Sequence, residues 1–218
     1  MVTLLAYRAA ILDYGTGNIA SLEMALSAAG SSPVLAREPA DLAGVAAVIL
    51  PGVGHFGPAS AALHGSGLAK ELRLRVANGL PVLGICLGFQ LLTAASEEAP
   101  AAAGLGLLPL ACERLRPHNT HLHKVPHLGW NTLEPSSAPS RLLQGITGAQ
   151  QRFYFANAYA IAPDPLMSAA QATYRHERPW LGLVELGAVC GVQFHPEKSR
   201  SQGLQLLRNF LALAADCH

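Results

Sequence analysis

The strongest chemical signal in the sequence is a cysteine between two glycines, in Gly84-Ile85-Cys86-Leu87-Gly88. The segment follows a short apolar run and precedes a helical pattern, so we expect Cys86 at a sharp strand-to-helix turn. Glycines permit the close packing that such a nucleophile elbow requires, and a helix N-terminus favours the thiolate form of a cysteine. A free cysteine is also a common buried apolar residue, so the motif alone leaves a structural role open.

A thiolate nucleophile needs a histidine to exchange its proton and a third group to orient that histidine. The segment 192–197 (VQFHPE) supplies both, in His195 and Glu197. Pro196 cannot donate a hydrogen bond to a central ladder, so it predicts the end of a strand. Taken singly, His195 suits a core histidine and Glu197 a helix-start acid. Together with the elbow they predict a Cys86–His195–Glu197 triad at the carboxyl edge of one sheet, where α/β proteins build their sites.

Acyl transfer also requires hydrogen-bond donors for the negative oxygen of the intermediate. Pro51-Gly52-Val53-Gly54 directly follows the apolar run 45–50, and its glycines allow backbone amides to face a substrate. A glycine-rich turn after a strand is also typical of plain loops and of phosphate sites. However, the segment lacks the G-x-x-x-x-G-K-S/T pattern and the third glycine of a dinucleotide fingerprint. Taken alone, it is a weak signal.

The spacing of histidines and cysteines does not favour a metal site. Four histidines lie between residues 116 and 127, but no cysteine or carboxylate at zinc-like spacing accompanies them. We therefore expect a polar surface loop there and no bound metal. The four cysteines form no C-x-x-C pair, which favours a reduced, cytoplasmic compartment. These residues are His118, His121, His123 and His127, and Cys86, Cys112, Cys190 and Cys217.

The composition of the 218-residue chain excludes several classes of protein. Its 15 basic and 14 acidic residues give a formal charge of +1, which argues against a nucleic-acid surface built on bulk charge. Only 13% of the residues are charged and 50% are hydrophobic, so the chain should bury a large core rather than remain disordered. The length suits one α/β domain over residues 1–218.

Two apolar stretches resemble membrane segments only superficially. In residues 1–12 the single basic residue, Arg8, lies inside the apolar run rather than before it, which is the wrong order for a secretory signal. The stretch between Arg75 and Glu97 has no charge, but it contains Pro81 and three glycines. It is therefore typical of a buried strand, a turn and a helix rather than a membrane span.

Short apolar runs alternate with helical patterns along most of the chain. This alternation predicts a three-layer α/β fold, with a mainly parallel central sheet covered by helices on both faces. The middle of the chain, residues 99–151, is less regular. The predicted strands are 9–13, 45–50, 81–85, 152–160 and 188–195, and the predicted helices are 19–29, 68–77, 87–95 and 202–214.

Together these motifs resemble those of the class I (triad-type) glutamine amidotransferases, in the same order along nearly the whole chain. The G-x-C-x-G and HPE segments are common to that family. Two further segments, 13–18 (DYGTGN) and 124–131 (KVPHLGWN), resemble the glutaminase subunits of imidazole glycerol phosphate synthase within it. The resemblance implies the flavodoxin-like fold of the class I glutamine amidotransferases.

The resemblance implies a glutaminase that needs no cofactor. Cys86 would attack the side-chain amide of glutamine, giving a γ-glutamyl thioester and ammonia, while His195 transfers the proton and Glu197 orients His195. Backbone amides would form the oxyanion hole at Gly52, Val53 and Leu87. The implied glutamine-binding positions are Gly52, Gln90, Glu98 and Tyr159.

The resemblance also implies a partner, a (β/α)8-barrel cyclase subunit. In the family, that subunit uses the ammonia to make imidazole glycerol phosphate and the AICAR nucleotide in histidine biosynthesis, and ligand on the cyclase switches on the glutaminase. The implied interface positions are Asn18, Trp130, Asn131 and Tyr154. For Trp130 and Tyr154, core packing is the alternative interpretation.

Three positions depart from the family pattern. Asn157 stands where the family has histidine, Ala158 lacks the hydroxyl expected near the glutamine carboxylate, and Phe89 replaces a usual methionine. Asn157 and Ala158 leave open a catalytically silent docking module. Two enzyme alternatives are an amidotransferase of the anthranilate or pyridoxal phosphate type, against which the KVPHLGWN segment argues, and a standalone cysteine hydrolase that turns over glutamine without a partner.

Overall fold

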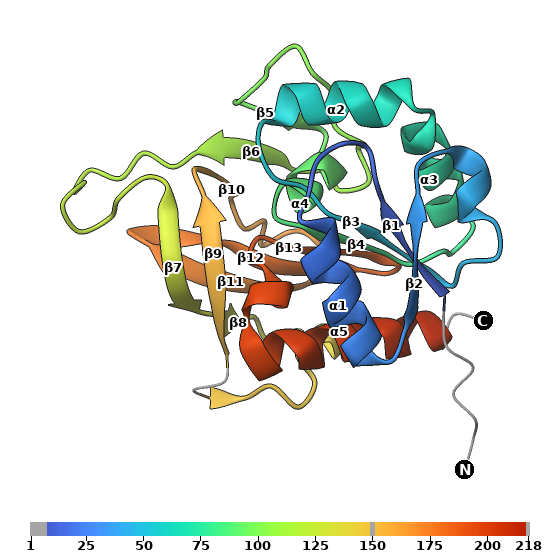
Figure 1. Cartoon of the computed structure of the whole chain (residues 1–218). Helices are drawn as coiled ribbons and strands as arrows, with labels where there is room; N and C mark the ends of the chain where they lie inside the picture. The colour runs from blue at the N-terminus through green and yellow to red at the C-terminus, as the bar shows by residue number, and fades with distance from the viewer. Residues whose placement is uncertain (1–7, 149–150, 217–218) are drawn as a thin grey trace.

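The structure, a computed structural model, describes residues 8–148 and 151–216 and arranges them as a large sheet between two layers of helices (Figure 1). The strands are β1 (Arg8–Leu12), β2 (Ser32–Ala36), β3 (Ala47–Leu50), β4 (Val82–Ile85), β5 (Ala95–Ser96), β6 (Ala111–Arg114), β7 (His127–Thr132), β8 (Glu134–Pro135), β9 (Arg152–Asn157), β10 (Tyr159–Ile161), β11 (Ala170–His176), β12 (Arg178–Leu186) and β13 (Val189–Val192). The helices are α1 (Ile19–Ala29), α2 (Phe56–Gly65), α3 (Leu68–Ala77), α4 (Leu87–Leu92) and α5 (Arg200–Ala215), with short 3-10 turns at Pro39–Leu42, Arg141–Leu143 and Pro196–Lys198.

The large sheet has the strand order β2-β1-β3-β4-β13-β12-β11-β8. Strands β2 to β13 in this order run parallel, whereas β12, β11 and β8 extend the sheet by antiparallel pairing. Parallel strands bring their carboxyl ends to one edge, so the loops after β1, β3, β4 and β13 meet there. The predicted α/β fold with a mainly parallel central sheet is confirmed, with an antiparallel extension that the sequence pattern did not reveal.

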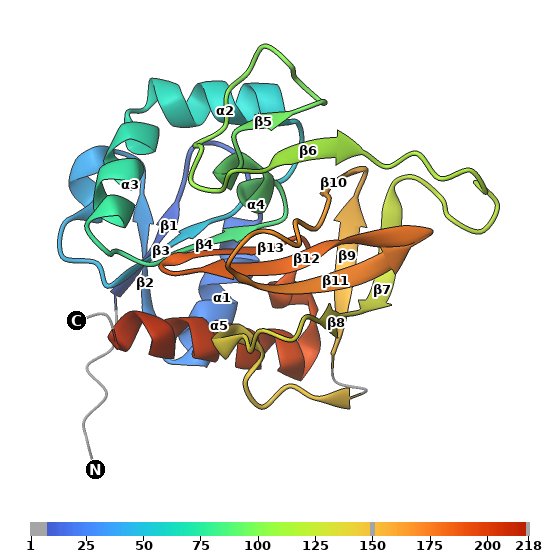
Figure 2. The same ribbon diagram turned by 180° about the vertical axis from the view of Figure 1, so that it is seen from behind.

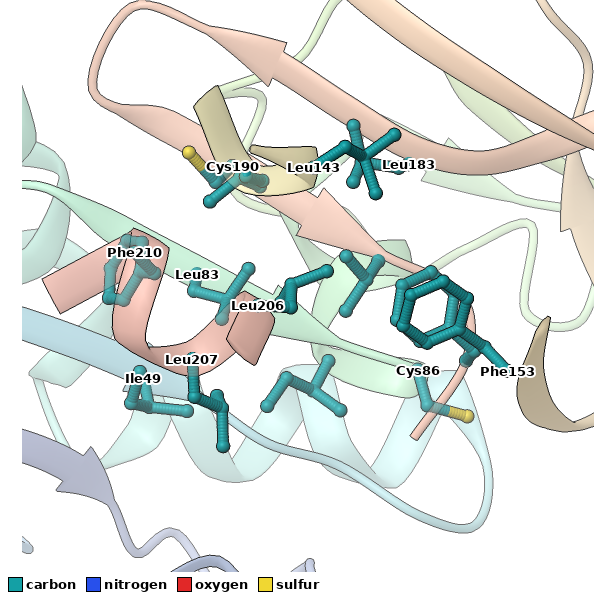
Figure 3. Packing of buried hydrophobic residues seen from close by; sticks show 14 of the residues in the cluster. Ile49, Leu83, Cys86, Leu143, Phe153, Leu183, Cys190, Leu206, Leu207 and Phe210 are labelled. Carbon is teal, nitrogen blue, oxygen red and sulfur yellow. The ribbon is translucent and has the colours of Figure 1, made fainter. Parts of the chain in front are cut away.

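Helices cover both faces of this sheet, as predicted. Helices α1 and α5 lie on one face, and α2, α3 and α4 lie on the other (Figures 1 and 2). Strand β1 explains the arrangement, because its alternate side chains enter two separate apolar clusters: Ala9 and Ile11 join α1 and α5, and Ala10 and Leu12 join α2 and α3. Figure 3 shows part of the first cluster, with Cys86 at one end of its labelled side chains.

Several predicted elements differ from the observed ones at their ends. Helix α4 ends at Leu92 rather than at residue 95, because the Thr93 hydroxyl donates to the Gln90 carbonyl (2.7 Å) and the chain turns away. The predicted strand 152–160 is divided after Asn157, where the chain leaves β7 and continues as β10 against β6. Helices α1 and α3 have the predicted bounds, and Gly30 ends α1 in the left-handed conformation (φ 101°).

Two small sheets flank the large one, in the order β10-β6-β5 and β7-β9. The β7–β9 ribbon lies beside strands β11 and β12 of the large sheet (Figure 2). These strands come from the irregular middle of the chain and from the segment that follows it. In the described part of the chain, no helix is long and apolar enough to cross a membrane.

A half-buried histidine, His127, attaches the β7–β9 ribbon to the large sheet. The His127 ring stacks on Tyr174 of β11 (centroids 5.5 Å apart, 10° between planes), and its Nε2 lies 3.2 Å from the Asn131 Nδ2 amide. Because that amide is a donor, Nε2 accepts and His127 must be neutral. Burial first, and then the neighbouring His176 and His123, lower the pKa of His127 to about 4.

This environment predicts that acid weakens the fold through His127. In the unfolded chain the residue takes up a proton near its ordinary pKa of about 6.5, whereas the folded chain resists protonation until about pH 4. The contribution to stability is therefore complete above pH 6.5 and is lost as the pH falls from there toward 4. A His127→Phe variant keeps a ring against Tyr174 but cannot titrate. Urea unfolding across this pH range should show a shallower loss of stability in the variant, and parallel curves for the two proteins would contradict the assignment.

Candidate active site

Cys86 lies at the strained turn between β4 and α4. Its backbone angles are φ 55° and ψ −110°, a region that non-glycine residues adopt at a cost of about 1–3 kcal/mol. The flanking glycines are required by close packing: a Cβ on Gly84 would lie 2.8 Å from the Gly88 carbonyl carbon, and a Cβ on Gly88 would overlap the Leu50 carbonyl oxygen. The predicted nucleophile elbow is therefore present, and Cys86 is buried except for a small exposed fraction of 7%.

The pairing of β4 with β13 brings the second part of the predicted triad to Cys86. Ile85 pairs with Val192 in the parallel ladder, and the Cys86 amide donates to the Val192 carbonyl (2.8 Å). Strand β13 ends at Val192 rather than at the predicted His195. The Gln193 amide continues the pairing with β12 by donating to Gly182 (2.9 Å), whereas the His195 amide donates to Tyr154 of β9 (2.8 Å). His195 and Cys86 line the same cavity.

His195 and Glu197 form a buried pair. The His195 Nδ1 atom lies 2.8 Å from the Glu197 Oε1 atom, and each side chain is 5% exposed. Burial by itself lowers the pKa of His195, but hydrogen bonds to Cys86 and Glu197 and their negative charges outweigh it, so the pKa is raised. The geometry thus favours an imidazolium ring between a cysteine sulfur and a carboxylate.

A cavity of about 260 Å³ opens beside the sulfur. Cys86, His195 and Lys198 line it, together with residues 156–159 from the end of β9 to the start of β10. Its volume is sufficient for a small-molecule substrate rather than a polymer. The remaining lining residues are Val53, Gly54, Leu87, Gln90 and Glu98.

The loop 51–54 packs against the first residues of α4, as the oxyanion prediction requires. A Cβ on Gly52 would lie 2.9 Å from the Leu87 Cβ and 2.9 Å from the Tyr14 hydroxyl. That hydroxyl donates to the Pro51 carbonyl (2.5 Å) and so holds the loop. Within residues 8–148 and 151–216, the backbone amides of Gly52, Val53 and Leu87 donate no hydrogen bond, which leaves them available as oxyanion donors.

The residues predicted to bind glutamine do not all line the cavity. Gln90, Glu98 and Tyr159 do, whereas Gly52 lines a smaller neighbouring hollow together with Asn18. The start of α2 fixes Glu98, whose Oε2 accepts from the Phe56 amide (2.8 Å) and whose Oε1 lies 3.1 Å from the His55 ring. The side-chain NH2 group of Gln90 donates to the Tyr159 carbonyl (3.1 Å).

Three of the predicted interface residues lie on the β7–β9 ribbon and the fourth, Asn18, lies before α1. Trp130 and Tyr154 pair across the β7–β9 ribbon with their rings 6.2 Å apart, and both are half-buried. Asn18 is exposed before α1. Asn131 donates to the Arg175 carbonyl (2.9 Å), which gives it a structural role as well. That these residues contact a partner stays a prediction.

The structure adds residues near the site that the sequence analysis did not select. Ser199 is buried, and its hydroxyl donates to the His195 carbonyl (2.6 Å) and accepts from the Tyr154 amide (3.0 Å). Gln193 contacts the Cys86 sulfur, and Tyr14 holds the loop 51–54. Gln193 lies inside the segment VQFHPE and Tyr14 inside DYGTGN, whereas Ser199 lies two residues after Glu197 and had no signal of its own in the sequence.

The predicted surface loop holds for His118, His121 and His123, which lie outside strands and helices, but it is wrong for His127, which lies in β7 and packs against Tyr174. The His118 amide and ring contact the Glu177 carboxylate, and Leu122 is exposed. Across the described ranges, no group of three or more His, Cys, Asp or Glu side chains has the geometry to hold a metal ion.

Comparison with known proteins places these features in a family. Residues 10–214 match the family described as "Glutamine amidotransferase class-I". The chain is 43% identical over 205 residues to the protein named imidazole glycerol phosphate synthase subunit HisH from Desulfovibrio desulfuricans, covering 92% of each chain. It is 41% identical over 208 residues to the protein of the same name from Synechococcus elongatus, covering 94% of this chain and 93% of that one.

Solved structures agree with the fold. A structure titled "Structure of PurLQS from Thermotoga maritima" superposes with a TM-score of 0.74 at 20% identity, covering 95% of this chain and 99% of that chain. Another, titled "Crystal structure of glutamine amidotransferase", superposes with a TM-score of 0.67 at 24% identity, covering 95% and 98%. At these identities the likeness concerns the fold alone.

The buried pair makes a direct prediction about His195. In a Glu197→Gln variant the negative charge beside the His195 ring is lost, so the pKa of His195 should fall by about one unit or more. Titration of the His195 ring signals by NMR measures this change. The variant keeps the shape of the side chain, so a titration identical to that of the parent protein would mean that Glu197 does not act on the ring.

Proposed function

The chain belongs to the class-I glutamine amidotransferase family, and we propose that it is the glutaminase subunit of an imidazole glycerol phosphate synthase. It hydrolyses glutamine to glutamate and ammonia and delivers the ammonia to a cyclase subunit in histidine biosynthesis. The observation that supports this most is the convergence of three side chains. Cys86 and His195 line one cavity, and Glu197 lies 2.8 Å behind the histidine ring.

The proposed reaction begins with a proton transfer. The Cys86 thiol gives its proton to His195, and the resulting thiolate attacks the side-chain carbonyl carbon of glutamine. Negative charge develops on the carbonyl oxygen, for which the amides of Val53 and Leu87, free and on the cavity wall, are the proposed donors. His195 then protonates the leaving nitrogen, so that ammonia departs and a γ-glutamyl thioester remains on Cys86. Water hydrolyses the thioester with His195 as the base.

Polar groups of the cavity wall are proposed to hold the glutamine. Glu98 offers a carboxylate to the α-ammonium group, and the Gln90 side-chain oxygen, which accepts no hydrogen bond within the described residues, offers a second acceptor. Lys198 lines the same cavity and can attract the α-carboxylate. Glu98 is 12% exposed and already fixed by the start of α2, so little ordering is required when the substrate binds.

The partner is proposed to be a (β/α)8-barrel cyclase that docks at the carboxyl edge of the sheet. Asn18, Trp130, Asn131 and Tyr154 are the proposed contact positions: Asn18 lines the hollow next to the loop 51–54, and the other three lie on the β7–β9 ribbon. We further propose that the whole chain forms one domain, that it needs no cofactor and that it acts in the cytoplasm.

Ammonia release from glutamine tests the proposed function. The purified chain is assayed alone, with the cyclase, and with the cyclase and its nucleotide ligand. We expect low activity alone, an increase by orders of magnitude in the full mixture, and none with the Cys86→Ala variant in any mixture. Equal activity in all three mixtures would indicate a standalone hydrolase, and inactivity in every mixture with intact binding would indicate a docking module.

Ala158 provides a second test, directed at the glutamine carboxylate. Ala158 lines the cavity without a hydroxyl, so Ala158→Ser adds one donor and should lower the KM for glutamine or leave it unchanged. The same substitution at the exposed Ala61 of α2, which does not line the cavity, is the control. Initial rates over a range of glutamine concentrations give KM, and a tenfold rise in the Ala158 variant would overturn this placement of the substrate.

A further inference from the structure

Gln193 is a fully buried polar side chain whose amide contacts the nucleophile. Its exposed fraction is 0%, and its Nε2 atom lies 3.8 Å from the Cys86 sulfur, within the range of an N–H···S hydrogen bond. Backbone bonds on both sides fix it: the preceding carbonyl, that of Val192, accepts from the Cys86 amide (2.8 Å), and its own amide donates to Gly182 (2.9 Å). These bonds fix the backbone of Gln193 beside Cys86, and burial together with a bond to Gln90 (3.1 Å) restrains its side chain.

A chain of hydrogen bonds determines which end of the Gln193 amide faces the sulfur. The Tyr159 carbonyl can only accept, so the amide end of Gln90 that lies 3.1 Å away must be its NH2 group. The same Nε2 atom lies 3.1 Å from Gln193, which must then present its oxygen to Gln90. The NH2 group of Gln193 is left facing Cys86. A flipped amide would set two donors against each other and place an oxygen against the sulfur.

Some polar groups around the Cys86 sulfur stabilise the thiol and others stabilise the thiolate. The Ala156 carbonyl oxygen lies 3.9 Å from the sulfur and can only accept, so it favours the protonated thiol. The Gln193 NH2 group can only donate, so it favours the anion, as does a protonated His195. Because Gln193 is buried, its bond to an anion is not weakened by competing water.

We propose that Gln193 stabilises the thiolate of Cys86 through its side-chain N–H, and that Gln90 holds Gln193 in the orientation this requires. The thiol proton passes to His195. The thiolate sulfur then accepts a hydrogen bond from the Gln193 side chain until its electron pair forms the bond to the substrate carbon. Gln90 also lines the cavity, so the residue proposed to contact glutamine is the one that orients Gln193 toward Cys86. The role of Gln193 in glutamine turnover rests on the proposed function, whereas its stabilisation of the Cys86 thiolate does not.

The test measures alkylation of Cys86 by iodoacetamide as a function of pH, in the absence of glutamine. Peptide mass mapping isolates the rate at Cys86 from the other cysteines. Gln193→Met keeps the length of the side chain but has no N–H. We expect the midpoint of the pH–rate profile to rise by about one unit, so that alkylation on the acid side slows about tenfold while the alkaline plateau is kept.

A matched control separates this effect from altered packing. Phe89→Met introduces the same side chain into the same region, because the Phe89 ring packs against Gly191 two residues before Gln193. It should leave the midpoint unchanged. If Gln193→Met does not fold, Gln193→Asn, whose amide is shorter by one methylene and cannot reach the sulfur, should give the same upward shift.

An unchanged midpoint in a folded Gln193 variant would overturn the proposal, and so would an equal shift in Phe89→Met. Neither result depends on glutamine turnover. The alkylation experiment can therefore fail while the ammonia assay succeeds, or succeed while that assay fails.

Discussion

The parallel pairing of β4 with β13 is the constraint on which the rest of the site depends. Residues 84–86 and 191–197 are far apart in the sequence, yet the register Ile85–Val192 brings the ends of their strands together. The bond from the Cys86 amide to the Val192 carbonyl (2.8 Å) then joins the proposed nucleophile directly to the segment that contains its proposed base, His195. A shift of one residue in this pairing would turn the side chains of one strand to the opposite face of the sheet.

This constraint explains why glycines are concentrated at the junction. Gly84 and Gly88 let α4 approach the sheet, and Gly191 leaves the space that the Phe89 ring occupies. The close approach brings the loop 51–54 against Leu87, so that backbone amides, the sulfur and the cavity share one small region. The strained angles of Cys86 persist because packing on every side fixes them.

Much of this could be predicted from the sequence, because the residues concerned lie in short motifs with a clear physical role. The elbow, the buried strands β3 and β4, and the helices α1 and α3 follow from glycine spacing and apolar periodicity. The β7–β9 ribbon could not be predicted in this way, because its two strands come from separate parts of the chain and a distant contact, His127 on Tyr174, attaches it to the large sheet. Likewise, the orientation of Gln193 depends on Gln90, which lies 103 residues earlier in the sequence, and through Gln90 on Tyr159.

The central claim is that Cys86 becomes acylated by glutamine, and direct detection of that intermediate is its most direct test. The chain, with the cyclase and its ligand, is mixed with glutamine, quenched in acid within the first turnover, digested and analysed by mass spectrometry. Our account predicts one glutamyl group on the peptide that contains Cys86, and its disappearance once glutamine is exhausted. Ammonia release with an unmodified Cys86, or with the glutamyl group on a different residue, would contradict it.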